Sequence, residues 1–355
     1  MDLKFNKFDY NKYLDDYFVL FNDAFPEVAD NSKVGYFWQM QGFPGENHHS
    51  FEYSAKLNNT LVGYYAAIPY KYVISGRIKT IGMVCGVMTC SKHRGKGIFT
   101  RLGSYSLQNL KDNVSFTTGY PIRKEVIPGH LKVGWKIAFE LPLYIKFLKV
   151  DSLFLKKAKP LYFLAPIVNM GFQLFYLILD IKQKHKAHNT FIYCDIETIA
   201  GLDKFEKSWL NDIPISLVKD SEFLKWRYSR PGASYKFIIV KVEDEICGFC
   251  SYRKIIKEGV PSFGILDLRA LHNNRKVIRS IIQKLEIEAK KDKVEAIMFM
   301  MSRVYSKKLG LINCGFLKSP YRFKLIINNL KNEFSNEFLH DQNNWHLMWV
   351  DSDDL

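Results

Sequence analysis

The chain has 355 residues, of which 47% are hydrophobic and 15% aromatic, so an intrinsically disordered protein is excluded and two domains of ordinary size are expected. Lys and Arg number 51 against 36 Asp and Glu, and the net charge of +15 favours anionic partners such as phosphate-bearing substrates or a membrane surface. Because no DNA- or RNA-binding module is found in the sequence, we expect no nucleic-acid partner.

The N-terminal part of the chain predicts helices followed by paired strands. Apolar residues between Tyr13 and Phe25 recur at helical spacing, and a second short helix is expected after Gly35. Short polar turns at Asn58-Asn59 and Ser75-Gly76 then separate apolar runs, which is typical of hairpins. The predicted strand pairs are 51–56 with 61–70, and 70–74 with 79–83.

A glycine-rich turn between a strand and a helix organises the rest of the chain. Residues 84–88 form an apolar run typical of a central strand, and apolar side chains at helical spacing begin at Ile98. Between them, Arg94-Gly95-Lys96-Gly97 combines two glycines with two basic side chains. Glycine lets the backbone approach a ligand, and the first amides of a helix lack intrahelical partners. The turn therefore predicts a phosphate or pyrophosphate site.

Three kinds of anion-binding turn can be compared with this one. The nucleotide P-loop needs Lys-Ser/Thr after its last glycine, where this chain has Ile98-Phe99, and the dinucleotide fingerprint needs a third glycine. The remaining pattern, Arg94-x-x-Gly97-x, resembles the GNAT acyltransferases. Their Arg/Gln-x-x-Gly-x-Gly/Ala signature follows a strand and holds the pyrophosphate of acetyl-CoA. Phe99 stands where the family has a small residue.

The resemblance implies a fold and an acyl donor. The implied fold is α/β (α+β), with two tandem GNAT-like domains, each a mixed, mostly antiparallel sheet flanked by helices. The donor substrate is acetyl-CoA, and no metal is expected. The amides of residues 88–90 are expected to polarise the thioester. The residues expected to bind the cofactor are Val87, Met88, Thr89, Arg94, Gly95, Lys96, Gly97, Ile98 and Phe99.

A strand at 114–121 is expected after the pyrophosphate helix. Because βαβ connections are right-handed, it should lie beside residues 84–88 and parallel to them. In the GNAT fold these two strands splay apart, and the resemblance implies that CoA enters the gap.

Residues 125–136 supply the candidate catalytic groups. Lys132, Gly134 and Trp135 match the family's closing Leu-Tyr-x-Lys-x-Gly-Phe, and His130 takes the place of the Tyr that protonates the departing thiolate. An imidazole can act near neutral pH, so His130 is predicted either to donate this proton or to be structural. Tyr120 is a candidate hydrogen-bond donor or packing residue, and Glu125 a candidate general base for the acceptor.

An uncharged stretch at residues 161–179 lies between lysine-rich flanks. Its length approaches a bilayer span, but polar residues and proline lower its hydrophobicity. Three interpretations are open: a helix buried between domains, a helix lying on an anionic membrane, and a true span. The second alternative would give a peripheral membrane contact through residues 160–180.

The expected domains are 1–150, with the acyl-CoA site; 151–190, an apolar helical linker that could face a membrane; and 191–355, a second GNAT-like domain. In the second domain the matching turn, His272 to Val277, has no glycine. One acyl-CoA site per chain is therefore predicted, in the first domain.

The resemblance extends to bacterial acetyltransferases of surface-polysaccharide assembly, through Met88-Thr89, Gly119-Tyr120-Pro121 and Trp226-Arg227-Tyr228. It implies N-acetyl transfer to an amino (or hydroxyl) group of a sugar that is nucleotide- or lipid-linked. The alternatives are an aminoacyl-tRNA-dependent peptidoglycan transferase, against which the intact turn argues, and a non-catalytic membrane-surface protein. Because Met1 to Lys4 are unlike a signal peptide, we expect a cytoplasmic protein, at the inner face of the membrane if the apolar stretch binds lipid.

Overall fold

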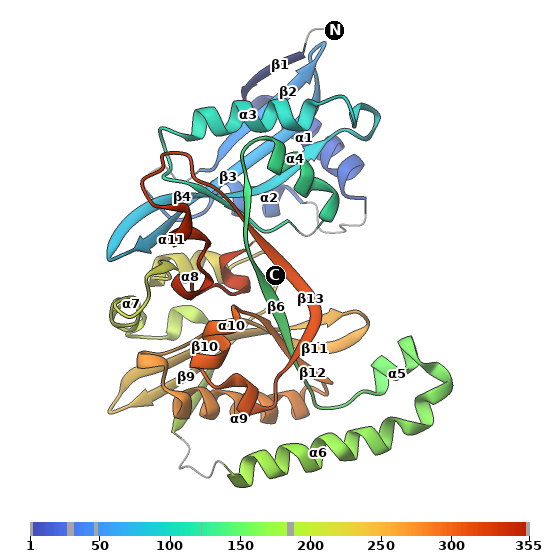
Figure 1. Cartoon of the computed structure of the whole chain (residues 1–355), viewed down its shortest axis with the longest axis vertical. Helices are drawn as coiled ribbons and strands as arrows, with labels where there is room; N and C mark the ends of the chain where they lie inside the picture. Colours follow the sequence, from blue (N-terminus) through green and yellow to red (C-terminus); the bar gives the residue numbers. More distant parts are fainter. Residues whose placement is uncertain (1–2, 27–31, 46–48, 122, 183–187, 353–355) are drawn as a thin grey trace. The chain divides into compact units, whose positions relative to one another are not determined.

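The computed structural model describes residues 3–26, 32–45, 49–121, 123–182 and 188–352. Their contacts form two compact units, each assembled from segments that are far apart in the sequence (Figure 1). Unit 1 comprises Met1–Phe139, Ser229–Gly232 and Lys324–Asn344, and unit 2 comprises Glu140–Tyr228, Ala233–Phe323 and Trp345–Leu355.

Unit 1 is built on a mostly antiparallel sheet with the strand order β1-β2-β3-β4-β5-β13. The predicted turns are confirmed, since Asn58 and Asn59, and then Ser75 and Gly76, have the positive φ that tight hairpins require. The four strands predicted after residue 60 are two long strands, because no turn sequence interrupts either of them. The strands are β1 (Leu3–Lys7), β2 (Phe51–Leu57), β3 (Thr60–Ile74), β4 (Arg77–Thr89), β5 (Thr117–Gly119) and β13 (Leu317–Asn328).

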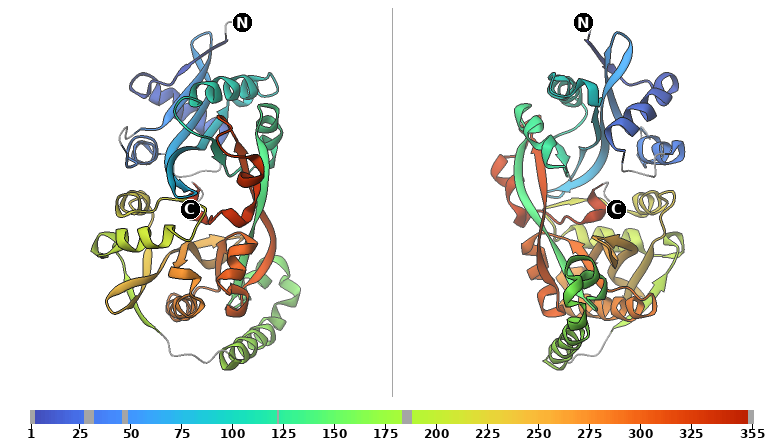
Figure 2. Two further views of the ribbon diagram at one scale, coloured as in Figure 1. Left: turned by 60° about the vertical axis from the view of Figure 1, so that its left-hand side comes forward. Right: turned by 90° about the vertical axis from the view of Figure 1, so that its right-hand side faces the viewer.

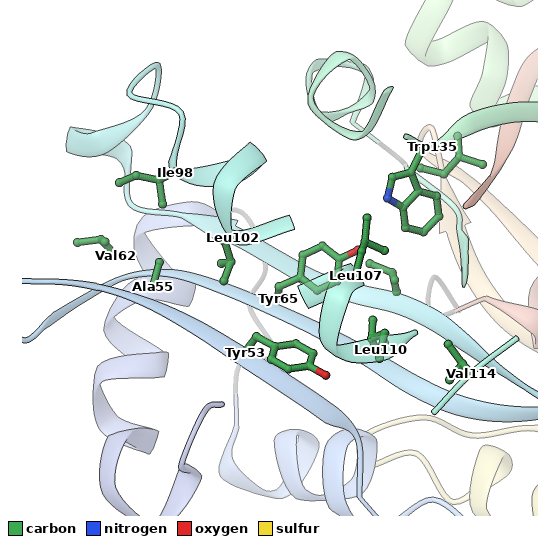
Figure 3. Close-up of a cluster of buried hydrophobic side chains, with 13 residues drawn as sticks. Tyr53, Ala55, Val62, Tyr65, Ile98, Leu102, Leu107, Leu110, Val114 and Trp135 are labelled. Atoms are coloured by element: carbon green, nitrogen blue, oxygen red, sulfur yellow. The ribbon is translucent and has the colours of Figure 1, made fainter. Parts of the chain in front are cut away.

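Helices cover both faces of this sheet because alternate residues of its strands point to opposite sides. Tyr53 and Tyr65 face α3 (Ile98–Leu110) in a hydrophobic core, shown in Figure 3. Their neighbours Glu52 and Tyr64 face α1 (Tyr10–Ala24) and α2 (Lys33–Gln41). The core side chains that α3 contributes are Ile98, Leu102, Leu107 and Leu110.

A buried carboxylate joins α2 to the sheet. Glu52 accepts hydrogen bonds from the hydroxyl of Tyr36 at 2.5 Å and that of Tyr64 at 2.6 Å, and further ones from Gln41 and Ser50. Burial raises the pKa of Glu52, although these donors oppose the shift. These four partners lie within unit 1, and we assign the cluster a structural role.

The predicted parallel pair is confirmed, and it is short. Gly82 and Met83 of β4 pair with Thr117 and Thr118 of β5. The pairing stops there among the described residues, so β4 has an open edge from Val84 to Thr89. A β-bulge at Gly86, with φ of +61°, interrupts the β3–β4 ladder in the same region.

The strands of unit 2 are ordered β6-β12-β11-β10-β9-β7. Its strands are β6 (Lys136–Phe147), β7 (Asn189–Tyr193), β9 (Lys236–Val242), β10 (Glu245–Lys257), β11 (Val260–Ala270) and β12 (Ala296–Met300). Its helices include α5 (Asp151–Lys157), α6 (Ala165–Lys182), α7 (Leu202–Leu210), α8 (Ser221–Tyr228), α9 (Arg275–Lys291) and α10 (Arg303–Lys308), with β8 (Ile215–Leu217) as a further short strand.

The two units exchange strands. Residues 143–147 of β6 follow the α-helices of unit 1 along the chain but pair with β12 of unit 2. Residues 326–328 of β13 follow unit 2 but pair with β5 of unit 1. The boundary at residue 150 expected from the sequence therefore falls inside unit 2, and residues 324–344 return to unit 1. Residues 343–349 form short 3-10 turns and one isolated bridge, from Trp345 to Ile215.

Candidate functional site

The turn between β4 and α3 has the backbone of an anion site. Gly95 and Gly97 have φ of +74° and +76°, in the left-handed region that glycine adopts without strain. Gly97 is the N-cap of α3 and has no side chain that could cap the helix. Its carbonyl accepts a hydrogen bond from the amide of Arg101. The preceding amides of α3, from Ile98 to Thr100, therefore have no intrahelical acceptor.

The turn forms one wall of a pocket of about 790 Å³ that lies within unit 1. Eight of the nine predicted cofactor residues line it, and Lys96 is the exception. Lys132 of the predicted closing motif also lines the pocket. Further lining residues, to which the sequence assigned no role, are Ala24, Phe25, His93, Thr100, Arg123, Val126 and Gly129. Glu125, a predicted catalytic residue, belongs to the lining as well.

Two polar contacts hold the end of α1 against the site. The Asp23 carboxylate accepts hydrogen bonds from the amide and the hydroxyl of Ser91, both at 2.6 Å, and these bonds lower the pKa of Asp23. Arg123 donates to the Ala24 carbonyl at 3.0 Å and stacks on the Phe25 ring. The turn and the segment before α4 (Ile127–Lys132) are thereby both fastened to α1.

The lining is predominantly basic, which suits an anionic ligand. Arg94, Arg123 and Lys132 contribute positive side chains, against the single carboxylate of Glu125 among the lining residues. The uncapped start of α3 adds the positive end of a helix dipole. Phe99 supplies an apolar wall, and its ring packs so closely on α4 that a Cβ at Gly129 would lie 2.5 Å from it.

The open edge of β4 identifies which backbone amide can polarise a carbonyl. Cys90 N donates to Val62 O at 2.9 Å, so the Cys90 amide is engaged, and its predicted part in polarising the thioester is wrong. Hydrogen bonds to one neighbour alternate along an antiparallel strand. The amide of Met88 therefore also faces β3, while that of Thr89 faces the edge that β5 leaves open.

His130 and Tyr120 lie outside the pocket lining. His130 is 4% exposed and packs edge-on against Phe99 and Trp135, with ring centroids 5.0 and 5.1 Å away. Burial lowers the pKa of His130 to about 4, so the imidazole is neutral at pH 7. Its only link to the pocket among these contacts is the Phe99 ring. The predicted parts of His130 and Tyr120 in proton transfer stay predictions.

The backbone of the turn leaves room for a phosphate group. A Cβ at Gly95 would meet no atom within 4 Å, and one at Gly97 would meet only Thr100 Oγ1 at 3.9 Å. The glycines are therefore not required by crowding within the protein; they leave space in front of free amides. Among the described residues no group of three or more His, Cys, Asp or Glu could hold a metal ion.

The corresponding turn of unit 2 is built differently. It also follows a long strand, β11, and leads through a 3-10 turn into α9, whose next strand, β12, runs parallel to β11. Here Asn274 caps the helix, since its side chain accepts the amides of Lys276 and Val277 at 3.0 and 3.4 Å. Two of the first three amides of α9 are thus already satisfied.

Comparison with known proteins is consistent with this geometry. Residues 10–138 match the acetyltransferase (GNAT) domain family. A search of curated protein sequences found no match.

Solved structures resemble the chain over most of its length. One is a probable N-acyltransferase of unknown function from Enterococcus faecalis, with a TM-score of 0.65 and 13% identity over 93% of this chain and 73% of that one. A GCN5-related N-acetyltransferase from Anabaena variabilis has a TM-score of 0.64 and 12% identity, with the same coverage. An N-myristoyltransferase from Saccharomyces cerevisiae with bound myristoyl-CoA has a TM-score of 0.58 and 12% identity over 93% and 79%. At these identities the likeness establishes the fold.

Proposed function

Because residues 10–138 match a GNAT acetyltransferase domain, we propose that this acyltransferase moves an acetyl group from acetyl-CoA to an amino (or hydroxyl) group of a sugar used in surface-polysaccharide assembly. The observation that carries the acyl-CoA part is the pocket of unit 1, where uncapped amides at the start of α3 meet a basic lining. The sugar acceptor rests on the sequence resemblance. The repeated order of elements in unit 2 supports a second GNAT-like domain without a cofactor site.

The proposed reaction makes modest demands on the chain. The amides of residues 98–100 and Arg94 would hold the pyrophosphate, and the Thr89 amide would polarise the thioester carbonyl as negative charge develops on its oxygen. The acceptor nitrogen attacks the carbonyl carbon, the C–S bond breaks, and CoA leaves as the thiolate. Glu125 would take the proton that the nitrogen loses. His130 would assist the thiolate, as the sequence predicts, and Tyr120 would donate a hydrogen bond.

The test is a thiol-release assay with acetyl-CoA and a panel of free, nucleotide-linked and lipid-linked amino sugars. We expect turnover with at least one acceptor. CoA binding without turnover on any acceptor would favour a non-catalytic protein, and absence of CoA binding would favour an aminoacyl-tRNA-dependent transferase.

A pair of neighbouring variants tests the role of Glu125. Glu125→Gln should lower kcat about a hundredfold, which is typical of a lost general base, and leave CoA affinity unchanged. Lys124→Gln, a change in the same 3-10 turn (Lys124–Val126) at a residue outside the lining, is the control and should keep its activity. Equal kcat values for the two variants would remove Glu125 from the mechanism.

A further inference from the structure

Helix α6 is docked on unit 2 by one of its faces. The Asn169 side chain accepts the amide of Val150 at 2.9 Å and donates to Asp151 at 3.2 Å, and the Tyr176 hydroxyl donates to the Phe147 carbonyl at 2.8 Å. Phe172 stacks on Tyr176 between these anchors. These contacts fix the helix along its length, so it cannot leave unit 2 to cross a bilayer without losing them.

The opposite face of α6 is also apolar, and it is exposed. Its side chains are spaced at helical intervals, and each is between 52% and 61% exposed: Ile167, Met170, Leu174, Leu177, Ile178 and Ile181. Phe163, in the preceding 3-10 turn, is 69% exposed. A helix that is apolar all round is normally buried in protein or lipid. However, only 6% of the most apolar part of Lys159–Leu179 is buried. The interpretation as a helix buried between domains is therefore wrong.

Among the described residues, Lys159–Leu179 is the one helical stretch long and apolar enough to span a membrane. In Figures 1 and 2 the helix lies at the edge of unit 2, with its long axis along the surface. A helix of 18 residues is about 27 Å long, and its outer face presents an extended apolar strip.

Basic residues flank α6 in the sequence. Lys149, Lys156 and Lys159 precede it and are exposed, and Lys182 is its last residue. The sequence of α6 contains a single acid, Asp180. Apolar side chains flanked by lysines are the pattern of helices that lie in the interface of an anionic membrane.

We propose that the outer face of α6 and the preceding turn dock on an anionic lipid bilayer, with the helix parallel to the membrane plane. A second copy of the chain is a poorer occupant, because it would bring the same lysines together. The anchoring of the inner face argues against a span. This inference does not depend on the proposed acetyl transfer, since it uses no residue of the unit 1 pocket.

The test uses the full chain and vesicles of equal parts phosphatidylglycerol and phosphatidylcholine. The wild-type protein should sediment with these vesicles. Its binding should be weaker at high salt, and weaker to vesicles of phosphatidylcholine alone. The double substitution Leu174→Glu with Ile178→Glu should weaken binding at least tenfold. The control, Ile78→Glu with Ile256→Glu, changes two isoleucines that are 66% and 78% exposed elsewhere and should bind like the wild type. Circular dichroism checks that both variants fold.

Three results would overturn the proposal. The first is equal vesicle binding by the two double variants, and the second is self-association that the α6 substitutions abolish in a protein that binds no vesicles. The third is resistance of the membrane-bound protein to alkaline extraction, which would mark a true span. Thiol release from acetyl-CoA is measured in parallel without vesicles. A failure of membrane binding is thereby distinguished from a failure of the enzyme.

Discussion

His130 shows how burial changes the meaning of a residue that sequence assigns to catalysis. Its alignment with a proton-donating Tyr predicts a titrating group at the thioester, but Phe99 and Trp135 enclose the imidazole and keep it neutral. The sequence could not reveal this, because the enclosing rings depend on how α4 packs against α3.

A pH-dependent measurement tests the environment of His130. Its folded-state pKa of about 4 lies below the ordinary 6.5, so the unfolded chain binds the proton more tightly. The stabilisation is present above pH 6.5 and is lost as the pH falls towards 4, by about 3 kcal/mol at 1.36 kcal/mol per pKa unit. His130→Phe lacks the titrating group, so its free energy of unfolding should not show this loss. The difference between the wild-type and variant stabilities, measured by chemical denaturation, should therefore change between pH 6.5 and 4.

The same variant separates the two roles predicted for His130. Parallel stability curves for the wild type and His130→Phe would contradict the burial argument. A His130→Phe enzyme with unchanged kcat would show that the imidazole takes no part in proton transfer, whereas a lower kcat with unchanged CoA affinity would support the sequence prediction.

The backbone of the turn was predicted well, because the local pattern determines it. The glycines of the turn have the backbone conformation that their spacing predicts, because φ is a local property. Ala24, Phe25 and Arg123 were missed, since they reach the pocket only through the tertiary contacts of α1. No periodicity or motif marks those contacts in the sequence.

Among the elements, hairpin strands and amphipathic helices were predictable, and strands of mixed composition were not. Polar turns delimit β2, β3 and β4, and apolar residues at helical spacing mark α1 and α3. β1 and β13 were missed because their sequences mix charged and apolar residues, as expected of strands exposed along part of their length.

A buried charge cluster connects α7, β11 and the C-terminal segment within unit 2. Arg269, 1% exposed, pairs with Glu206 of α7 and with Asp267 at 2.7 Å. Lys219 lies 3.3 Å from Asp267 and 3.8 Å from Asp351. The arginine lowers the pKa of Asp267 against the desolvation that would raise it.

Removing the arginine should destabilise the protein strongly. Arg269→Met leaves two buried carboxylates without their shared cation, and we expect unfolding to become easier by about 3–5 kcal/mol in chemical denaturation. Lys204→Met, which breaks the exposed pair with Glu245, is the matched control and should cost less than about 1 kcal/mol. A similar small effect for Arg269→Met would mean that water or side-chain rearrangement compensates the charges.

At the scale of the whole molecule, sequence order predicted two halves with the same order of elements but not the exchange of strands between them. β6 begins in unit 1 and continues into unit 2, and β13 begins in unit 2 and ends in unit 1. Local propensity determines whether a strand forms. Its partner strand depends on long-range pairing, which cannot be read from a single sequence.

The repeat also explains why one half alone is expected to bind CoA. The same position is a helix start with free amides in unit 1 and a helix start capped by Asn274 in unit 2. A chain with two similar units should therefore bind a single CoA molecule.

Calorimetric titration of the full chain with CoA, repeated with two glycine variants, tests this account most directly. Gly97→Val and Gly76→Val both place a branched residue at a φ near +76°, where no crowding is found, so their costs in stability should be alike. We predict one CoA per chain, lost with Gly97→Val and kept with Gly76→Val. Two sites per chain, or full affinity in Gly97→Val, would contradict it.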